Sequence, residues 1–274
     1  SSGGSVRCES ETAHTPGEWH AAIFAHAAKI GITVFSSPFD PTAVDLLDSL
    51  GAPAFKIASF EIVDLPLIRY AARLGKPMIL STGMASLGEI EEAVTLLRDM
   101  GSFFALLHCT SGYPTPAEDS ALRTIPHMAQ TFDAVVGLSD HSHGIAVPVA
   151  ATALGASIVE KHFTLSRAEG GVDADFSLEP AEFSAMAEGC RTAWKALGQI
   201  DYGLKPSEKG AVSGRRSLYV VADVRAGETL TSQTVRSIRP GFGLPPKYLP
   251  DIVGKTASRD LKKGEPVAWS MIEP

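Results

Sequence analysis

The sequence predicts an α/β fold with a parallel sheet, followed by a small β-rich domain. Three observations support this prediction. Segments with helical periodicity alternate with short apolar segments, which is the pattern of a parallel sheet. The apolar segments are continuous and do not alternate with polar residues, as expected for strands buried on both faces. After residue 197 the helical periodicity stops, and short β-like segments separated by turns replace it.

The predicted helices have recognisable ends. Thr15 followed by Pro16 is typical of an N-cap with proline in the first turn, and Ser86 with Glu89 forms a capping-box pattern. Glycine follows the last periodic residue of most helices. These signals place helices at about residues 15–30, 40–50, 86–100 and 180–197, and before Gly75 and Gly155.

Six strands are predicted between these helices, at residues 32–36, 54–58, 77–80, 104–107, 134–138 and 157–160. A closed barrel of this type needs eight β/α units and typically about 250 residues. The six units therefore predict a TIM (β/α)8-type barrel whose first two strands are absent from this chain. An open doubly wound sheet is the alternative, but no Gly-rich phosphate-binding loop follows any predicted strand.

The change of composition divides the chain into three parts. The barrel is predicted at residues 12–201, a linker at 202–216 and a second domain at 217–274. The linker is rich in Gly, Lys, Ser and Arg and lacks periodicity. The second domain has β-like segments at 217–221 and 268–269 and a tight Pro/Gly loop at 239–243.

Bulk composition excludes several classes of partner. The 274 residues contain 24 Lys and Arg against 31 Asp and Glu, a net charge of −7, and no long basic run, which argues against nucleic acid and against a polybasic membrane patch. No apolar run approaches the roughly 18 residues of a membrane span, and no signal peptide is visible. Cys8, Cys109 and Cys190 make neither a disulfide framework nor a paired zinc motif, so we expect a reducing, cytoplasmic location.

Polar residues gather where the predicted strands end. In a barrel of this type the chemistry lies at the carboxyl ends of the strands. Hydroxyls and lysines gathered on one rim suit an anionic ligand such as a phosphate or a carboxylate. The strand-end residues are Ser36, Ser37, Lys56, Ser59, Glu61, Ser81, Thr82, residues 108–111, residues 139–141 and residues 160–162.

His141 and His162 end neighbouring strands in this prediction. Neighbouring strands lie about 4.8 Å apart, so two imidazoles at equal height can share one metal ion. An ion with only two protein ligands keeps open positions, which suits a Lewis acid that polarises a substrate oxygen. A pair of hydrogen-bonded core histidines is the alternative.

Lys56 has several interpretations. A Schiff-base lysine needs apolar surroundings, whereas the serines expected nearby favour a clamp for an anion. The structural alternative is an ion pair between Lys56 and Glu61 inside the barrel. Glu61 is accordingly either a proton-transfer residue or only the partner of this lysine. The serines at strand ends have helix capping as their alternative role.

These strand ends resemble the sialic acid synthase family, and the segment after residue 217 resembles the antifreeze-like domain of that family. The matching segments are residues 35–39, 55–57, 80–84, 108–114, 137–141 and 160–164. Within the family, the segments at 58–62, 124–126, 177–180 and 239–244 are most similar to the pseudaminic acid synthase branch. N-acetylneuraminate synthases usually have Gly-Ser-Gly-Glu where this chain has Ala58-Ser59-Phe60-Glu61.

The resemblance implies a reaction. A divalent metal, usually manganese with magnesium or cobalt as alternatives, assists the condensation of phosphoenolpyruvate with a 2,4-diacetamido-2,4,6-trideoxy hexose of altrose type. The product is a nine-carbon keto sugar acid, and phosphate leaves by C–O cleavage. The resemblance also implies a homodimer with exchanged C-terminal domains.

The resemblance assigns a role to each matching residue. The implied metal ligands are His141 and His162. Glu61 and Tyr113 match positions near the reacting carbons, Asp173 matches a carboxylate that binds sugar hydroxyls, and Arg239 matches an arginine that reaches into the partner's barrel and holds the N-acyl group. The implied phosphoenolpyruvate ligands are Lys56, Ser59, Ser81, Ser111 and Ser139, of which Ser111 replaces an Asn found in some members.

One departure from the family pattern concerns the first strands. Family members begin with a Glu-Ile-Gly-x-Asn-His motif and a Lys-x-Gln motif, and neither occurs here. We therefore expect an open barrel and negligible turnover from this chain alone. The alternative functions are a synthase of legionaminic or N-acetylneuraminic acid and, in another class, a non-catalytic glycan- or ice-binding module.

Overall fold

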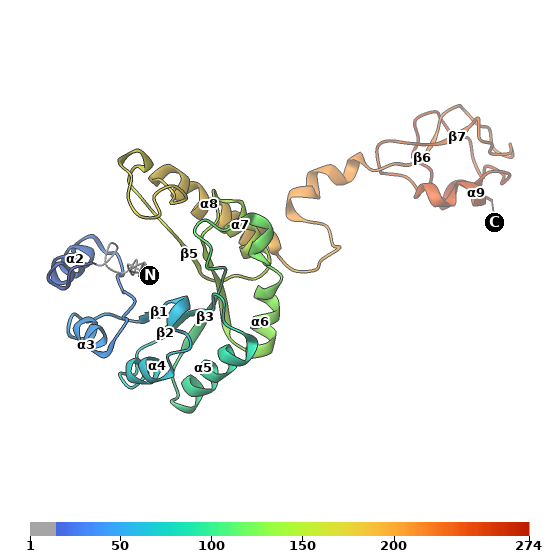
Figure 1. Cartoon of the computed structure of the whole chain (residues 1–274). Helices are drawn as coiled ribbons and strands as arrows, with labels where there is room; N and C mark the ends of the chain where they lie inside the picture. Colours follow the sequence, from blue (N-terminus) through green and yellow to red (C-terminus); the bar gives the residue numbers. More distant parts are fainter. Residues whose placement is uncertain (1–14, 274) are drawn as a thin grey trace, which may run out of the picture. The chain divides into compact units, whose positions relative to one another are not determined.

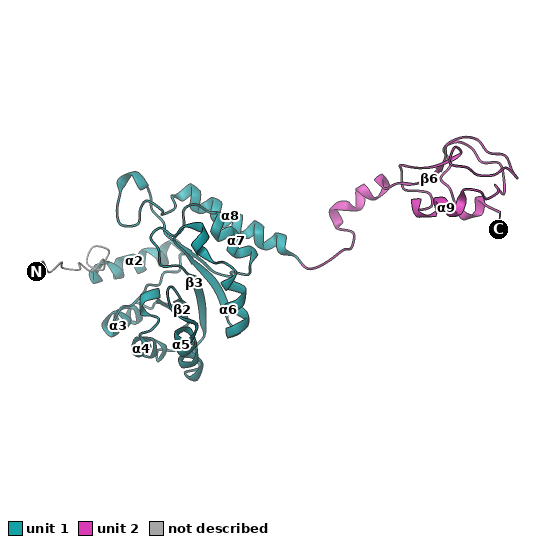
Figure 2. Ribbon diagram, turned by 45° about the vertical axis from the view of Figure 1, so that its right-hand side comes forward, with its two compact units in different colours: residues 1–198 teal, residues 199–274 magenta. Residues whose placement is uncertain are grey.

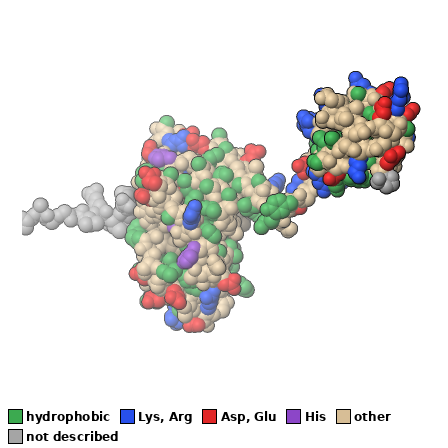
Figure 3. All heavy atoms as spheres, turned by 90° about the vertical axis from the view of Figure 1, so that its right-hand side faces the viewer, with side chains coloured by type: hydrophobic (Ala, Val, Ile, Leu, Met, Phe, Trp, Pro, Cys, Tyr) green, Lys and Arg blue, Asp and Glu red, His purple; other side chains and the backbone are tan. Residues whose placement is uncertain are grey.

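The computed structural model describes residues 15–273 of the chain. The chain divides into two compact units, residues 1–198 and 199–274 (Figure 2). Within the described residues, no helix is long and apolar enough to cross a membrane. On the face in view in Figure 3, acidic and basic side chains are interspersed on each unit, and no broad basic patch is present.

The first unit contains a parallel sheet whose strand order follows the chain, β1-β2-β3-β4-β5 (Figure 1). Each connection therefore leads to the next strand, as in a barrel, and the predicted α/β fold with a parallel sheet is confirmed. The strands are β1 (Phe55–Ile57), β2 (Met78–Ser81), β3 (Phe104–Cys109), β4 (Val135–Asp140) and β5 (Val159–Lys161).

The helices of the first unit follow one another around the sheet (Figure 1). Local signals start several of them. The Asp40 carboxylate accepts a hydrogen bond from the Ala43 amide at 2.9 Å, and Ser86 with Glu89 forms the predicted capping box. The predicted Thr15 cap is wrong, because Pro16 is the N-cap and makes no side-chain cap. The helices are α2 (Gly17–Ile30), α3 (Pro41–Ser49), α4 (Leu65–Ala72), α5 (Leu87–Asp99), α6 (Thr124–Phe132), α7 (Ala146–Ala153) and α8 (Pro180–Leu197).

The strand predicted at residues 32–36 is reduced to a single bridge. Ser36 pairs with Phe55, and its carbonyl accepts a hydrogen bond from the Lys56 amide at 3.3 Å. Within the described residues this segment has a strand on one side only, and Ile32 is 59% exposed. An apolar segment with one pairing partner and little burial lacks the support that keeps β1 to β5 regular.

The sheet is curled. Five parallel strands at about 4.8 Å spacing would separate β1 from β5 by about 19 Å if the sheet were flat. Lys56 on β1 nevertheless reaches Glu160 on β5, with Nζ and Oε2 3.3 Å apart. The side chains of the two edge strands can meet only because the sheet bends around them. The described sheet is therefore a half-barrel with a polar interior at this level.

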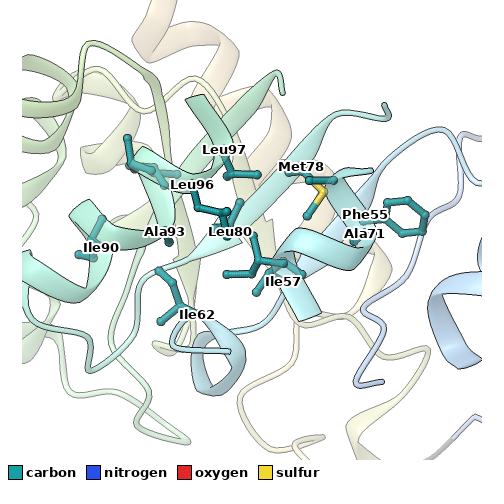
Figure 4. Packing of buried hydrophobic residues seen from close by; sticks show 14 of the residues in the cluster. Phe55, Ile57, Ile62, Ala71, Met78, Leu80, Ile90, Ala93, Leu96 and Leu97 are labelled. Atoms are coloured by element: carbon teal, nitrogen blue, oxygen red, sulfur yellow. The ribbon is translucent and has the colours of Figure 1, made fainter. Parts of the chain in front are cut away.

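Apolar side chains fill the layer between strands and helices (Figure 4). Ile57, Met78 and Leu80 of the strands are fully buried, as is Leu97 of α5. Each such side chain contributes about 1.5–3 kcal/mol through burial. This layer holds the strand ends, and therefore the polar residues at them, on a rigid support.

The second unit has its own core and a small antiparallel sheet of β6 (Ser217–Val220) and β7 (Val235–Ile238). It also contains α9 (Leu249–Ile252) and the 3-10 helices η4 (Pro206–Gly214), η5 (Pro246–Tyr248) and η6 (Trp269–Met271). The first predicted β-like segment is thus confirmed, but the one at 268–269 runs into η6. The predicted linker contains η4, which hydrophobic periodicity did not reveal. Local signals start this helix: Pro206 lies in its first turn, and the Glu208 carboxylate accepts a hydrogen bond from the Lys205 amide at 2.8 Å.

Candidate active site at the carboxyl ends of the strands

His141 and His162 face each other at the carboxyl ends of β4 and β5. The register pairs Asp140 with Lys161, so the two histidines are the next residues on the two neighbouring strands. Their ring centroids lie 5.2 Å apart with the ring planes at 72°. His141 is buried, and the side chain of His162 is about one third exposed. The structure therefore brings the predicted pair together, with one ring open to solvent.

The partners of the two rings leave one nitrogen of each available. The His141 Nδ1 lies 3.0 Å from the carbonyl oxygen of Thr110, and a carbonyl can only accept, so this nitrogen carries a proton. The His162 Nδ1 lies 3.7 Å from a carboxylate oxygen of Asp173. Metal-binding histidines are commonly held in this way by a carbonyl or carboxylate on the other nitrogen. The Nε2 atoms of the two rings are therefore the nitrogens that could serve as ligands of a divalent ion.

The pKa values of the two histidines are shifted in opposite directions. Burial lowers the pKa of His141, but the contact with the Cys109 thiol (3.9 Å) and the Thr110 carbonyl more than compensate, so its pKa lies above the ordinary value. Burial and the neighbouring charge of His141 hold the pKa of His162 below the ordinary value. His162 is therefore neutral at neutral pH, which is the form that binds metal ions.

No group of three or more His, Cys, Asp or Glu side chains among residues 15–273 is arranged to hold a metal ion. An ion on His141 and His162 would consequently take its remaining ligands from water or substrate. The aromatic rings of Tyr113 and Phe176 border the pair, with centroids 4.4 Å from His141 and 5.0 Å from His162, respectively.

Lys56 is buried and pairs with Glu160 at 3.3 Å; the alternative of an ion pair with Glu61 is therefore wrong. Glu160 also accepts a hydrogen bond from the Ser139 hydroxyl at 2.6 Å. Its side chain is 41% exposed, so the carboxylate can turn toward water when an anion approaches the lysine. Lys56, Ser139 and Glu160 thus form one polar cluster inside the curled sheet.

A second group of hydroxyls converges from the loops after β1, β2 and β3. The Ser59 hydroxyl donates to the Cys109 sulfur at 3.2 Å. A Cβ atom added to Gly83 would lie 2.4 Å from Ser59 Cβ and 2.7 Å from Ser111 Oγ. Gly83 is therefore required for Ser59 and Ser111 to approach each other. The Ser81 hydroxyl is buried without a hydrogen-bond partner among the described residues, as expected of a group that awaits a ligand.

Glu61 ends the 3-10 helix η1 (Ser59–Glu61), and its Oε2 is buried without a hydrogen-bond partner among the described residues. Burial raises its pKa, and the negative charge of Asp64 adds to this, while the positive charge of Lys56 acts in the opposite direction. A carboxyl with a raised pKa can hold a proton closer to neutral pH than an ordinary glutamate. This property is compatible with proton transfer.

Arg239 lies outside this unit, in the loop after β7. It is exposed, and its side chain makes no hydrogen bond or ion pair within the described part of the chain. Sequence reasoning placed Glu160, Cys109, Asp140 and Lys161 among the polar strand ends but assigned none of them an individual partner or role. The available signal was a charged residue inside an otherwise apolar strand, which is rare without a reason.

Comparison with known proteins identifies the family of the chain. The model of the NeuB family matches residues 4–202, and the model of the SAF domain matches residues 215–273. The chain belongs to the NeuB family. The predicted resemblance to sialic acid synthases is thereby confirmed. Cys8 lies in the part of the matched segment before residue 15, outside the described structure.

Several NeuB-family relatives are close in sequence. The chain is 42% identical to the pseudaminic acid synthase of Helicobacter pylori, over 96% of this chain and 78% of that protein. It is 40% identical to the N,N'-diacetyllegionaminic acid synthase of Campylobacter jejuni, over 90% of this chain and 75% of that protein. The crystal structure of N-acetylneuraminic acid synthetase from Leptospira borgpetersenii, in complex with citrate, matches 73% of this chain and 70% of that one with a TM-score of 0.69 and 35% identity.

Proposed function

We propose that this NeuB-family chain carries the site of a synthase that joins phosphoenolpyruvate to the open-chain aldehyde of an amino sugar. The products are a nine-carbon keto sugar acid and inorganic phosphate. The observation that carries the proposal is the histidine pair beside the buried Lys56 cluster, because it provides a cation site and an anion site on one sheet. The 42% identity to pseudaminic acid synthases supports a 2,4-diacetamido-2,4,6-trideoxy hexose of altrose type as the sugar.

Lys56 and the surrounding hydroxyls would bind the charged groups of phosphoenolpyruvate. Lys56 supplies the cation once Glu160 has turned away from it. Charge-assisted hydrogen bonds of this kind are roughly twice as strong as neutral ones. The buried hydroxyl of Ser81, which has no partner among the described residues, supports this assignment. The proposed ligands are Lys56, Ser59, Ser81, Ser111 and Ser139.

His141 and His162 would hold a divalent metal ion, for which we propose manganese, with magnesium and cobalt as alternatives. Such an ion supplies Lewis-acid polarisation of the aldehyde oxygen when it is bound. The two rings are already oriented for this purpose, because their Nδ1 atoms are directed toward the Thr110 carbonyl and the Asp173 carboxylate. Asp173 would in addition bind hydroxyls of the sugar.

The proposed chemistry has two stages. C3 of phosphoenolpyruvate attacks the aldehyde carbon, and the aldehyde oxygen takes up a proton to become a hydroxyl. Water then adds to C2 and loses one proton, and the C2–O bond to phosphate breaks while the second proton of the water passes to the departing phosphate, which leaves a ketone. Glu61, with its raised pKa and an Oε2 atom that has no hydrogen-bond partner among the described residues, is the proposed proton-transfer group, and Tyr113, next to His141, would border the reacting carbons.

The second unit would complete the sugar site. We propose a homodimer in which the SAF domain of one chain lies against the barrel of its partner. Arg239 is exposed and makes no side-chain hydrogen bond or ion pair among residues 15–273, so its guanidinium is available for the N-acyl group of the sugar. A non-catalytic glycan- or ice-binding role for this domain is the alternative of another class.

Metal binding and isotope labelling test the proposal. His141→Ala and His162→Ala should each weaken manganese binding severely, whereas His127→Ala, which changes an exposed histidine on α6, should not. Unchanged binding in both site variants would contradict the metal assignment. In ¹⁸O-labelled water, C–O cleavage places the label in the keto acid and leaves the released phosphate unlabelled. Labelled phosphate would show that the P–O bond breaks instead.

A legionaminic-type sugar is the second candidate, because the chain is 40% identical to a diacetyllegionaminic acid synthase. A direct comparison separates the candidates. The altrose-type diacetamido sugar, the sugar precursor of legionaminic acid and N-acetylmannosamine are each offered with phosphoenolpyruvate to an enzyme that also contains the family's Glu-Ile-Gly-x-Asn-His and Lys-x-Gln motifs, because negligible turnover is expected from this chain alone. We expect the highest kcat/KM for the altrose-type sugar. A higher value for either of the others would reassign the substrate.

A further inference from the structure

A buried ion pair joins β4 and β5 directly beside the histidine pair. The Lys161 Nζ lies 2.6 Å from Asp140 Oδ2, and the exposed fractions of the two side chains are 0% and 3%. The Asp140 carboxylate also accepts hydrogen bonds from the Ser142 amide (3.2 Å) and hydroxyl (3.0 Å). Lys161 in turn donates to the Ser142 carbonyl. These three residues, the Asp140–Lys161–Ser142 cluster, satisfy one another without solvent.

Stability gives little reason for this cluster. Removing two charges from water costs several kcal/mol for each ion, and apolar residues of similar volume are often as stable or more stable in such a position. The two earlier positions of β4 on the same face as Asp140, Val136 and Leu138, are buried and apolar. The ion pair is therefore better explained by its position next to the histidines than by its contribution to the free energy of unfolding.

Each member of the cluster is a direct chain neighbour of a histidine. Asp140 and Ser142 flank His141, and Lys161 precedes His162. Because the register pairs Asp140 with Lys161, the ion pair forms the last cross-strand contact before the histidines.

We infer that the Asp140–Lys161–Ser142 cluster is a positioning device that sets the separation of His141 and His162 for one divalent cation. The inference rests on the metal site proposed above. A hydrogen bond at Nδ1 orients the His141 ring, and the Asp173 carboxylate faces Nδ1 of His162 at 3.7 Å, but neither contact fixes the distance between the two strand ends. The cluster does so, since it ties the backbone on both sides of His141 to the residue before His162. Metal–ligand distances tolerate only about 0.2 Å, so loss of this link is felt at the ion.

The test replaces the ion pair by apolar residues in the full chain, Asp140→Leu with Lys161→Met. A matched control breaks the ion pair of Lys76 and Asp48, which also spans 2.6 Å but lies before β2 at the opposite ends of the strands. Manganese affinity is measured by electron paramagnetic resonance, and the ligand field by the visible spectrum of bound cobalt. Thermal unfolding monitors the fold. We expect the double variant to fold and to bind manganese about 10- to 100-fold more weakly with altered cobalt bands, and the control Lys76→Met/Asp48→Leu to match the parent.

A folded double variant with the affinity and cobalt spectrum of the parent overturns the inference. If the double variant does not fold, Ser142→Ala decides, because it removes a single hydroxyl from the cluster. Several-fold weaker manganese binding supports the inference, and unchanged binding overturns it. If the His141→Ala and His162→Ala variants bind manganese as well as the parent does, the proposed metal site fails and the inference fails with it. If these two variants lose manganese but the cluster variants bind it like the parent, only the inference fails.

Discussion

Gly83→Ala should damage the proposed phosphoenolpyruvate site more than it damages the fold. Gly83 has φ of +46°, and an added Cβ would lie 2.4 Å from Ser59 Cβ and 2.7 Å from Ser111 Oγ. Ordinary contacts between carbon atoms are about 3.5–4.0 Å, so Ser59 must move by about 1 Å or more. A displaced hydroxyl loses its hydrogen bond to a charged ligand, which is worth about 1.5–3 kcal/mol. The expected result is a phosphoenolpyruvate Kd raised about 10- to 150-fold.

The matched control for this prediction is Gly101→Ala. Gly101 also has a positive φ, +65°, but nothing lies within 4 Å of an added Cβ. Both variants carry the backbone cost of about 1–2 kcal/mol for a non-glycine residue in this conformation, and only Gly83→Ala carries the clash. Titration calorimetry with phosphoenolpyruvate and thermal unfolding separate the two effects. Equal phosphoenolpyruvate affinities in the two variants would refute the reasoning.

Three further predictions concern the remaining site residues. Lys56→Met should raise the phosphoenolpyruvate Kd by about 10- to 150-fold, since it removes the cation and one charge-assisted hydrogen bond; calorimetry checks this, and an unchanged Kd excludes the clamp. Glu61 has a raised pKa in the folded chain, so its contribution to stability is fully present below the ordinary value of 4.5 and is lost as the pH rises through the folded pKa. Glu61→Gln should therefore gain stability relative to the parent between acidic and neutral pH, measured by urea unfolding, and a pH-independent difference would count against the shift. Arg239→Ala should raise the KM of the sugar at least 10-fold more than that of phosphoenolpyruvate, as expected for the loss of one charge-assisted hydrogen bond; equal effects on both would argue against a role in sugar binding.

Local patterns predicted much of the first unit, because several helices, such as α3, α4 and α5, have side-chain caps at their N-termini. The capping box at Ser86 and the continuous apolar strands needed no long-range information. The segment at 32–36 had the same apolar character but forms only one bridge, since strand formation depends on a partner and local composition does not. The 268–269 segment shows the same limit, as it runs into a 3-10 helix.

The sequence predicted those residues of the candidate site that lie at the ends of neighbouring strands. It did not predict the contacts that depend on the curvature of the whole sheet. His141 and His162 could be paired because consecutive strands are neighbours and the residues end them. The partner of Lys56 could not be found in this way. Glu61 is near in sequence, yet the lysine pairs with Glu160 from the other edge of the sheet. Only the bending of the whole sheet brings these two strands together, and no local signal contains that information.

The same curvature explains how an anion site and a metal site could serve one reaction. Ser139 and Glu160 lie two residues before His141 and His162, and residues two apart on a strand face the same side. The Ser139 hydroxyl and the Glu160 carboxylate, which form a polar cluster with Lys56, therefore lie about 6.6 Å before the histidines along the strands. That is about the span of a three-carbon acid phosphate. An anion held at Lys56 would thus extend its reactive carbon toward the carbonyl carbon of an aldehyde whose oxygen is held at the histidines, which is the arrangement that a carbon–carbon condensation requires.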